Sequence, residues 1–300
     1  PGTLENMGLS PEQLHADNPG LVIVRLSGWG QTGPYRELPG FGSLIEGFSG
    51  YAHKHRSDGG APQLPNMALA DMVTGLTGAF ATLTALREVE VRGGQGQVID
   101  LSLLEPMLAI MGPDVSNFAA TGIDPEPGQK IASPRGSYQC KDGLWVSMSG
   151  STDTMAKRVF EAIGQSALFE DPRFSSNAAR LENDGELDAM VAQFMLQRTQ
   201  DECLKHFRQH GVTVGPIYAP PQLIQDAHVV QRGVYVQCEA SNGNETTVMH
   251  QVTPRLQGTP GSIRRAAPLR GQHTEELLSE LGASAAECQS LKTQGAIECR

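Results

Sequence analysis

The stretch PNMALADMVTG, residues 65–75, places a single carboxylate, Asp71, in front of one of the longest amphipathic patterns in the chain. Gly93 and Gly94 supply a stop signal at the far end of that pattern. Within it, apolar residues recur at intervals of three and four, which is the period of an α-helix: Val73, Leu76, Phe80, Leu83 and Leu86. The sequence therefore predicts a long helix with Asp71 at or beside its N-terminus.

The position of Asp71 has two interpretations. The helix dipole and the free backbone N–H groups at a helix start favour negative charge, so the carboxylate would stay ionised and the same groups would help to stabilise an oxyanion beside it. Asp is also among the preferred N-cap residues, and capping is the commoner role for an arbitrary Asp before an apolar run. The local sequence alone leaves both interpretations open.

Predicted strands lie on either side of this helix in the sequence. Residues 21–26 are a short apolar, β-branched run that ends in the glycine-rich loop SGWGQTGP, residues 27–34. Residues 98–101 form a second predicted strand. Strands that alternate with helices imply an α/β fold with a mainly parallel sheet. The other elements expected here are a short helix at 41–50, a surface loop at 52–65 and a helix from Leu103 to about Ala120.

The character of the sequence changes after residues 121–136, which are rich in proline and glycine and are predicted to be a linker. The linker separates a large domain at 1–120 from a smaller α+β domain at 137–218. A hairpin opens the smaller domain, because two strand-like segments flank Lys141-Asp142-Gly143. Further helices are expected at about 152–163, 184–197, 200–210, 222–231 and 273–281, with strands at about 234–240 and 245–252 around Asn242-Gly243-Asn244. The tail beyond Ser284 is expected to be frayed.

The overall composition excludes several classes of function. The 300 residues carry a formal net charge of −10, which argues against general nucleic-acid binding. The five cysteines are scattered without metal-type spacing, so we expect free thiols in a reducing compartment and no metal site. No uninterrupted run of about 18 apolar residues is present, so no membrane span is expected. Gly94-Gln95-Gly96 opens a strand rather than a helix, which is the wrong order for a dinucleotide fingerprint.

Seven short segments together resemble the class III CoA-transferase family, also called the CaiB/BaiF family. They are GWGQTGP at 28–34, then 39–50, ALAD with Thr74-Gly75 at 68–75, GQGQVID at 94–100, KDG at 141–143, GVTVGP at 211–216 and GQHT at 271–274. Each segment is weak alone, but their order and spacing are specific, and the resemblance runs from Pro1 to about Gly282. It implies a large Rossmann-like domain with a smaller α+β domain, residues 219–300 returning to the large domain, and two identical chains interlocked as a homodimer.

The opening of the chain, PGTLENMGL, resembles an internal piece of this family. We therefore expect an N-terminally truncated member that lacks the first βαβ part of the large domain. We also expect it in the cytoplasm, or in the mitochondrial matrix or peroxisome if the source is eukaryotic.

The resemblance implies a chemistry for Asp71. In the family, the carboxylate at this position is a nucleophile that passes CoA from an acyl-CoA to a carboxylic acid through an anhydride and an aspartyl-CoA thioester. Coenzyme A is then a substrate and product, and no permanently bound cofactor or metal is implied. Besides Asp71, the resemblance places seven residues beside CoA or the substrate: Gly28, Gly30, Gln31, Phe41, Gly42, Ala70 and Gly150. Residues 147–152, which include Gly150, align with a loop that covers the nucleophile in some members, although the stretch has only one glycine here. The alternative is a plain strand-to-helix turn capped by Ser151 or Thr152.

Two alternatives remain. The racemase branch of the family uses a second base, a His, where this chain has Phe41, and a phenyl ring cannot exchange a proton. CoA transfer is therefore preferred over racemisation. The other alternative is a truncated, non-catalytic member that lacks part of its CoA pocket. The weakly polar Pro39, Phe41 and Gly42 favour a larger dicarboxylate or organic acid, such as glutarate, succinate or a carnitine-like acid, over oxalate as the acceptor.

Overall fold

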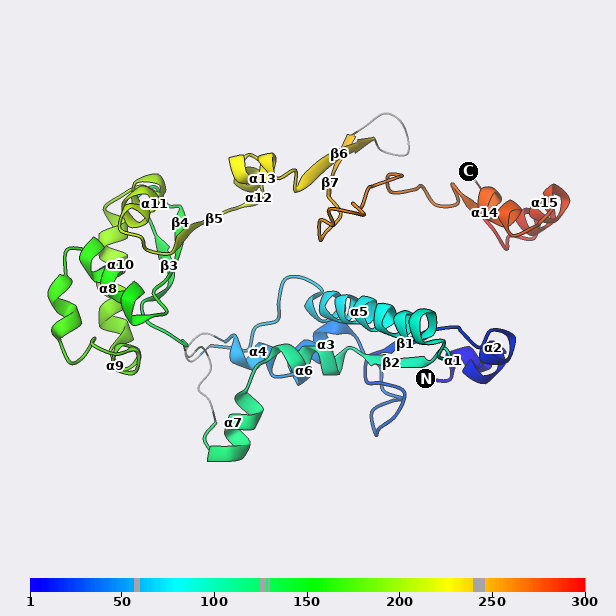
Figure 1. Ribbon diagram of the computed structural model, residues 1–300, viewed down its shortest axis with the longest axis horizontal. Helices are drawn as coiled ribbons and strands as arrows, with labels where there is room; N and C mark the ends of the chain where they lie inside the picture. The colour runs from blue at the N-terminus through cyan, green and yellow to red at the C-terminus, as the bar shows by residue number, and fades with distance from the viewer. Residues whose placement is uncertain (57–59, 125–127, 129, 240–245, 300) are drawn as a thin grey trace. The chain divides into compact units, whose positions relative to one another are not determined.

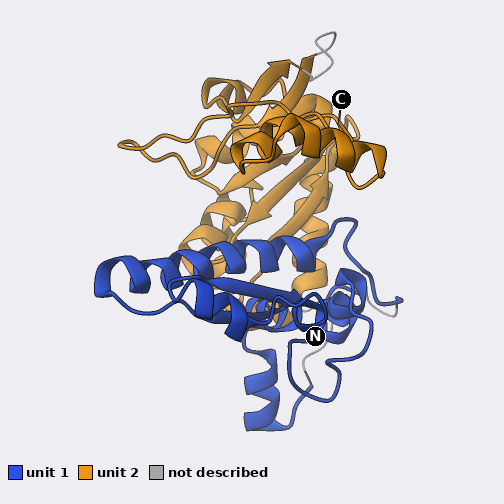
Figure 2. Ribbon diagram, turned by 90° about the vertical axis from the view of Figure 1, so that its right-hand side faces the viewer, with its two compact units in different colours: residues 1–131 blue, residues 132–300 orange. Residues whose placement is uncertain are grey.

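The computed structural model describes residues 1–56, 60–124, 128, 130–239 and 246–299. The chain divides into two compact units, residues 1–131 and residues 132–300 (Figure 2). The division falls inside the segment 121–136 that the sequence marks as a linker. The finer predicted domains at 1–120, 137–218 and 219–300 stay predictions.

Unit 1 is built on a parallel pair of strands. β1 (Ile23–Ser27) pairs with β2 (Val98–Ser102) in register from Ile23 opposite Val98 to Ser27 opposite Ser102. Between them in sequence runs the long helix α5 (Leu69–Arg92), which packs against β2 and against α6 (Leu104–Ile110) (Figure 1). The predicted strand–helix–strand order with parallel pairing is therefore confirmed in this unit.

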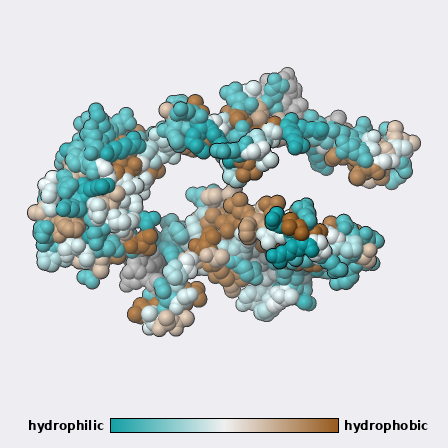
Figure 3. Space-filling model, viewed as in Figure 1, coloured by the Kyte–Doolittle hydropathy of each residue, from teal (hydrophilic) through white to brown (hydrophobic). Residues whose placement is uncertain are grey.

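The face that α5 turns toward its neighbours is made of small residues. Ala70, Thr74, Gly78 and Ala85 are its buried residues, and a Cβ at Gly78 would come within 2.8 Å of Leu101 on β2. Three of the five apolar residues that define the helical period point outward instead, since Leu76, Phe80 and Leu83 are 76%, 73% and 68% exposed, whereas Val73 packs against the buried cluster around Ala70. Figure 3 accordingly shows hydrophobic residues gathered over this helix. Small side chains on α5 thus bring it close to the sheet.

The length and hydropathy of α5 also suit a membrane-spanning helix, and 22% of its most apolar window is buried inside the protein. A core helix of a soluble protein meets the same criteria, so this property is weak evidence for a membrane. The packing of α5 against β2, α6 and α3 (Gly42–Phe48) gives it a structural role within unit 1.

The remaining helices of unit 1 differ from the sequence expectation in three places. One helix was expected at 103–120, but Gly112 and Pro113 separate α6 from α7 (Asp114–Thr121) because Pro113 cannot continue the helical hydrogen bonding. The predicted loop at 52–65 begins inside a short helix, α4 (Tyr51–Lys54). Two N-terminal helices were not predicted: α1 (Thr3–Asn6) and α2 (Pro11–Asp17), the latter started by a capping box between Ser10 and Gln13.

Unit 2 begins with an antiparallel sheet in the order β3-β4-β5. The predicted hairpin is confirmed as β3 (Arg135–Gln139) and β4 (Trp145–Ser149), and β5 (Val214–Ile217) pairs with the other side of β4. The helices that follow β4 are α8 (Asp153–Ala162), the 3-10 helix η1 (Ser166–Glu170), α9 (Asn177–Glu182), α10 (Asp184–Leu196) and α11 (Gln200–Gln209). Of these, α8, α10 and α11 match the predicted helices closely. Their apolar faces bury Val146, Val159, Val191, Met195 and Phe207.

The C-terminal part of unit 2 consists of short elements. They are α12 (Pro220–Leu223), α13 (Ala227–Gln231), the antiparallel pair β6 (Tyr235–Glu239) and β7 (Thr246–His250), α14 (Thr274–Glu280) and α15 (Ala285–Thr293). The helix expected at 222–231 is two helices, because Asp226 caps a new start. The expected frayed tail was wrong, since a capping box between Ser284 and Glu287 starts α15. The predicted turn at Asn242-Gly243-Asn244 lies outside the described residues.

Candidate active site

Asp71 lies in the first turn of α5 but does not cap it. The N-cap residue is Ala68, whose side chain makes no capping bond, so the N-cap interpretation of Asp71 was wrong. The side chain of Asp71 is exposed, and within the part of the chain that the structure describes it makes no hydrogen bond or ion pair. An exposed carboxylate without a partner among the described residues, at the positive end of a 24-residue helix, is accessible to a reactant.

The start of α5 is held by α3. Glu46 on α3 is 3% exposed, and its Oε1 accepts a hydrogen bond from the backbone N–H of Ala70 at 3.1 Å. Apolar packing fixes the same junction, because Ile45, Ala70 and Met107 are fully buried together. The residue that precedes Asp71 is therefore fixed by both a hydrogen bond and close packing.

A second part of α3 lies directly against the carboxylate of Asp71. Gly42, the first residue of α3, has no room for a side chain, since a Cβ there would overlap Oδ2 of Asp71. Three of the predicted site residues, Gly42, Ala70 and Asp71, are thus brought together. Phe41 precedes them as the N-cap residue of α3, with its side chain 73% exposed.

The glycine-rich loop at residues 27–34 contacts the segment that leads into α3. A Cβ at Gly28 would lie 2.5 Å from the Cα of Gly40, so the two backbones cross in direct contact. Trp29 donates a hydrogen bond from Nε1 to the carbonyl oxygen of Pro39 at 3.1 Å. Pro39 and Gly40, which lead to Gly42, are therefore fixed against the glycine-rich loop.

The predicted site residues Gly30 and Gln31 use their amides inside the protein. The N–H of Gly30 donates to Oγ of Ser27, and the N–H of Gln31 donates to both carboxylate oxygens of Asp100, each at 3.0 Å. These amides are not free to bind a phosphate, and a contact between these residues and CoA stays a prediction. The role of Asp100 was missed, although a carboxylate inside the apolar strand segment 98–101 was a visible signal.

Gly150 lies in unit 2, just after β4. Its N–H donates to the carbonyl oxygen of Pro134 at 2.7 Å, and a Cβ at Gly150 would press on the same oxygen. Its glycine identity is explained by this close approach. The expectation that Gly150 covers the nucleophile stays a prediction.

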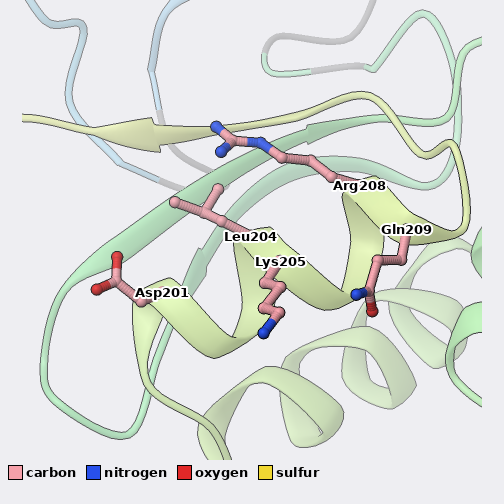
Figure 4. Close-up of a pocket in the computed structure, with 5 residues that line it drawn as sticks. All are labelled: Asp201, Leu204, Lys205, Arg208 and Gln209. Atoms are coloured by element: carbon pink, nitrogen blue, oxygen red, sulfur yellow. The ribbon is translucent and has the colours of Figure 1, made fainter. Parts of the chain in front are cut away.

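Two surface hollows lie away from these residues. One, of about 470 Å³, follows the side of α11, where Figure 4 shows Asp201, Lys205 and Arg208 arranged along a single helix. Because one helix forms all of its lining, it is a solvated helix face. The other, of about 640 Å³, is lined in unit 1 by residues of α4, α6 and α7, including the ion pair of Lys54 and Asp114. Neither hollow is lined by a predicted site residue.

Comparison with known proteins assigns this fold to a class of enzyme, the CoA-transferases. The chain belongs to CoA-transferase family III, whose family model matches residues 1–274. The resemblance seen in the sequence is therefore confirmed, as is the α/β fold.

Individual relatives are similar over nearly the whole chain. Succinyl-CoA–D-citramalate CoA-transferase of Chloroflexus aurantiacus is 36% identical over 288 residues, which cover 94% of this chain and 70% of that protein. The alpha subunit of succinyl-CoA–L-malate CoA-transferase of Chloroflexus aurantiacus is 35% identical over 299 residues, covering 98% and 69%. The crystal structure of a CAIB/BAIF family protein from Brucella suis superposes with a TM-score of 0.78 at 26% identity, covering 93% of this chain and 73% of that one.

Proposed function

We propose that Asp71 is the nucleophile of this class III CoA-transferase and that it carries CoA between a donor and an acceptor acid. The observation that supports the proposal is the state of the Asp71 carboxylate. It lies in the first turn of a long helix, is exposed, and has neither a capping role nor an ion-pair partner within the described residues. A carboxylate in this setting is available to attack a thioester.

The first half of the reaction moves CoA onto the protein. An oxygen of Asp71 attacks the carbonyl carbon of the acyl-CoA, the C–S bond breaks, and an acyl-aspartyl anhydride and CoA thiolate result. The thiolate then attacks the carbonyl carbon of Asp71, the C–O bond to the donor breaks, and the donor acid leaves as a carboxylate. The aspartyl-CoA thioester remains.

The second half reverses these steps with the acceptor acid. The acceptor carboxylate attacks the aspartyl carbonyl carbon and expels the thiolate, which gives a new anhydride. The thiolate attacks the acceptor's carbonyl carbon, the new acyl-CoA leaves, and the Asp71 carboxylate is restored. Each step exchanges one good leaving group for another, so no strong base is required.

The start of α5 assists the oxyanions that form in these steps. The backbone N–H of Asp71 has no hydrogen-bond partner among the described residues, while that of Ala70 is bound by Glu46. A free N–H and the positive end of the helix dipole both favour negative charge beside the Asp71 carbonyl. Phe41 supplies no ionisable group at the position of the racemase base, and this supports transfer over racemisation.

We further propose succinyl-CoA as the donor and a short hydroxy-dicarboxylate as the acceptor. The support is the printed names of the relatives, which act on D-citramalate and L-malate with succinyl-CoA. The exposed ring of Phe41 beside Gly42 gives the acceptor a weakly polar neighbour. On family grounds we also propose an interlocked homodimer in the cytoplasm, and light scattering of the purified protein tests the dimer.

Mass spectrometry tests the nucleophile. The protein is incubated with succinyl-CoA, treated with hydroxylamine, digested and searched for a hydroxamate. We expect the label on Asp71 in the native protein, its loss in Asp71→Asn, and its retention in Asp201→Asn, a matched variant of an exposed aspartate on α11. CoA transfer that persists in Asp71→Asn, or an unlabelled Asp71 in the native protein, would overturn the proposal.

A further inference from the structure

Glu46 is a buried carboxylate that the proposed chemistry does not use. It is 3% exposed, next to the fully buried Ile45, in the cluster that joins α3, α5 and α6. Transferring a carboxylate out of water costs several kcal/mol unless it gains hydrogen bonds of good geometry. The partner found for Glu46 is the N–H of Ala70 at 3.1 Å. Glu46 thus binds the backbone one position before the proposed nucleophile.

Glu46 and Gly42 act on the nucleophile from the same helix. They stand four residues apart on α3, so they lie on one face of it. Gly42 contacts the side chain of Asp71, and Glu46 holds the backbone that leads into it. A shift of α3 would therefore have two effects at once. It would move the backbone at Asp71, and it would change the space around the Asp71 carboxylate.

A side-chain acceptor suits this contact, because the N–H groups in the first turn of a helix have no partner within the helix. Without such an acceptor, the N–H of the fully buried Ala70 would lose its hydrogen bond. Glu46 occupies the N–H of Ala70, and the next amide, the N–H of Asp71, has no partner among the described residues.

We propose that Glu46 is a positioning residue that fixes the start of α5 and, through Ala70, the orientation of Asp71 for attack. The inference rests on the proposed role of Asp71 as the nucleophile. Glu46 touches neither the substrate nor the reacting atoms in this scheme. It acts through the backbone, so its loss affects the chemical steps more than the binding of the acyl-CoA.

Two variants of Glu46 and one control test the proposal. Glu46→Gln keeps an oxygen that can accept from Ala70. Glu46→Met removes the acceptor with little change in side-chain length, so it avoids a large cavity. Val191→Ala is the control: it weakens the packing of a fully buried residue in the core of unit 2 and leaves the junction of α3 and α5 unchanged. The measurements are the rate of Asp71 labelling by succinyl-CoA, kcat and KM for transfer to L-malate, and thermal unfolding.

We expect Glu46→Met to lower the labelling rate and kcat by up to ~100-fold, because a displacement of about 1 Å at a reacting group has effects of that size. KM should change little, Glu46→Gln should restore most of the rate, and Val191→Ala should keep the native rate while lowering the unfolding temperature. If the native protein labels Asp71 and Glu46→Met labels it at the same rate, this inference is overturned and Asp71 remains the proposed nucleophile. An equal loss of rate in Val191→Ala would also overturn the inference, because the loss would then follow stability and not the contact with Ala70. Failure of the native protein to label Asp71 would instead overturn the proposed function.

Discussion

Gly42 and Asp71 are in such close contact that a single methyl group at residue 42 would overlap the carboxylate of residue 71. The two residues come from different helices and are separated by the whole loop between α4 and α5 in sequence. Their contact limits the rotamers open to Asp71, because one side of its carboxylate is closed by the backbone of α3.

The first prediction follows from this contact. Gly42→Ala should force the Asp71 carboxylate into another rotamer and reduce kcat and Asp71 labelling by ~100-fold, as expected for a misplaced reacting group. Gly47→Ala is the matched control, because it lies on the same helix and an added Cβ there meets nothing within 4 Å. The contact has no catalytic consequence if both variants transfer CoA at the native rate.

The second prediction concerns a buried arginine in unit 2. Arg180 is fully buried and donates to the carbonyl oxygens of Ser133 and Phe174 and to Oδ1 of Asp153. Arg180→Leu would leave two carbonyl oxygens and a carboxylate without this donor, so we expect a loss of about 3–5 kcal/mol in the free energy of unfolding. Urea unfolding of the native protein and of Arg180→Leu measures this loss.

Arg173 provides the control for that experiment. Its ion pairs with Asp171 and Glu186 are at the surface, where side-chain entropy and solvent offset most of the attraction. Arg173→Leu should therefore change the urea midpoint far less than Arg180→Leu. Equal shifts in the two variants would show that the buried hydrogen bonds of Arg180 do not stabilise unit 2.

The third prediction concerns alkaline pH. Burial raises the pKa of Tyr138 far above its ordinary value of 10.0, and the hydrogen bond to Asp188 at 2.6 Å raises it further. A raised pKa in the folded state means that the stabilisation is complete below pH 10 and is lost as the pH rises above it. The free energy of unfolding should therefore fall above pH 10, and it should fall less steeply in Tyr138→Phe. If the free energy of unfolding falls equally steeply with pH in the native protein and in Tyr138→Phe, the loss does not come from Tyr138.

The fourth prediction concerns the cysteines. Burial raises the pKa of Cys203 to about 12, and burial also raises the pKa of Cys140. Because the thiolate is the reactive form, iodoacetamide at pH 8 should modify both residues much more slowly than the half-buried Cys238. Peptide mass spectrometry measures the order, and all five cysteines should react in urea. Rapid native modification of Cys203 would indicate that the core of unit 2 is open.

Local patterns were sufficient for most of the elements near the site. The three- and four-residue spacing behind Asp71 predicted α5, and Lys141-Asp142-Gly143 predicted the hairpin of β3 and β4. Two further signals were readable but unused: Gly112-Pro113, which divides α6 from α7, and the pair Ser284 and Glu287, which starts α15.

The features that position the proposed nucleophile depend on contacts between distant segments. A single Glu in an amphipathic helix normally faces solvent, so nothing near Glu46 in the sequence indicates that it binds Ala70. The orientation of α5 was equally hidden. Periodicity shows which residues share a face, but packing of Gly78 against Leu101 selects the small-residue face for the interior.

The crossing of Gly28 and Gly40 determines where this protein tolerates redesign. Any side chain at either glycine would push apart two backbones, and the displacement would pass along the chain to Gly42. Phe41 lies between these constrained points, yet its ring extends into solvent. A directed-evolution library should therefore hold the glycines constant and randomise residue 41, which changes an exposed side chain beside the proposed nucleophile and leaves the backbone contacts around it intact.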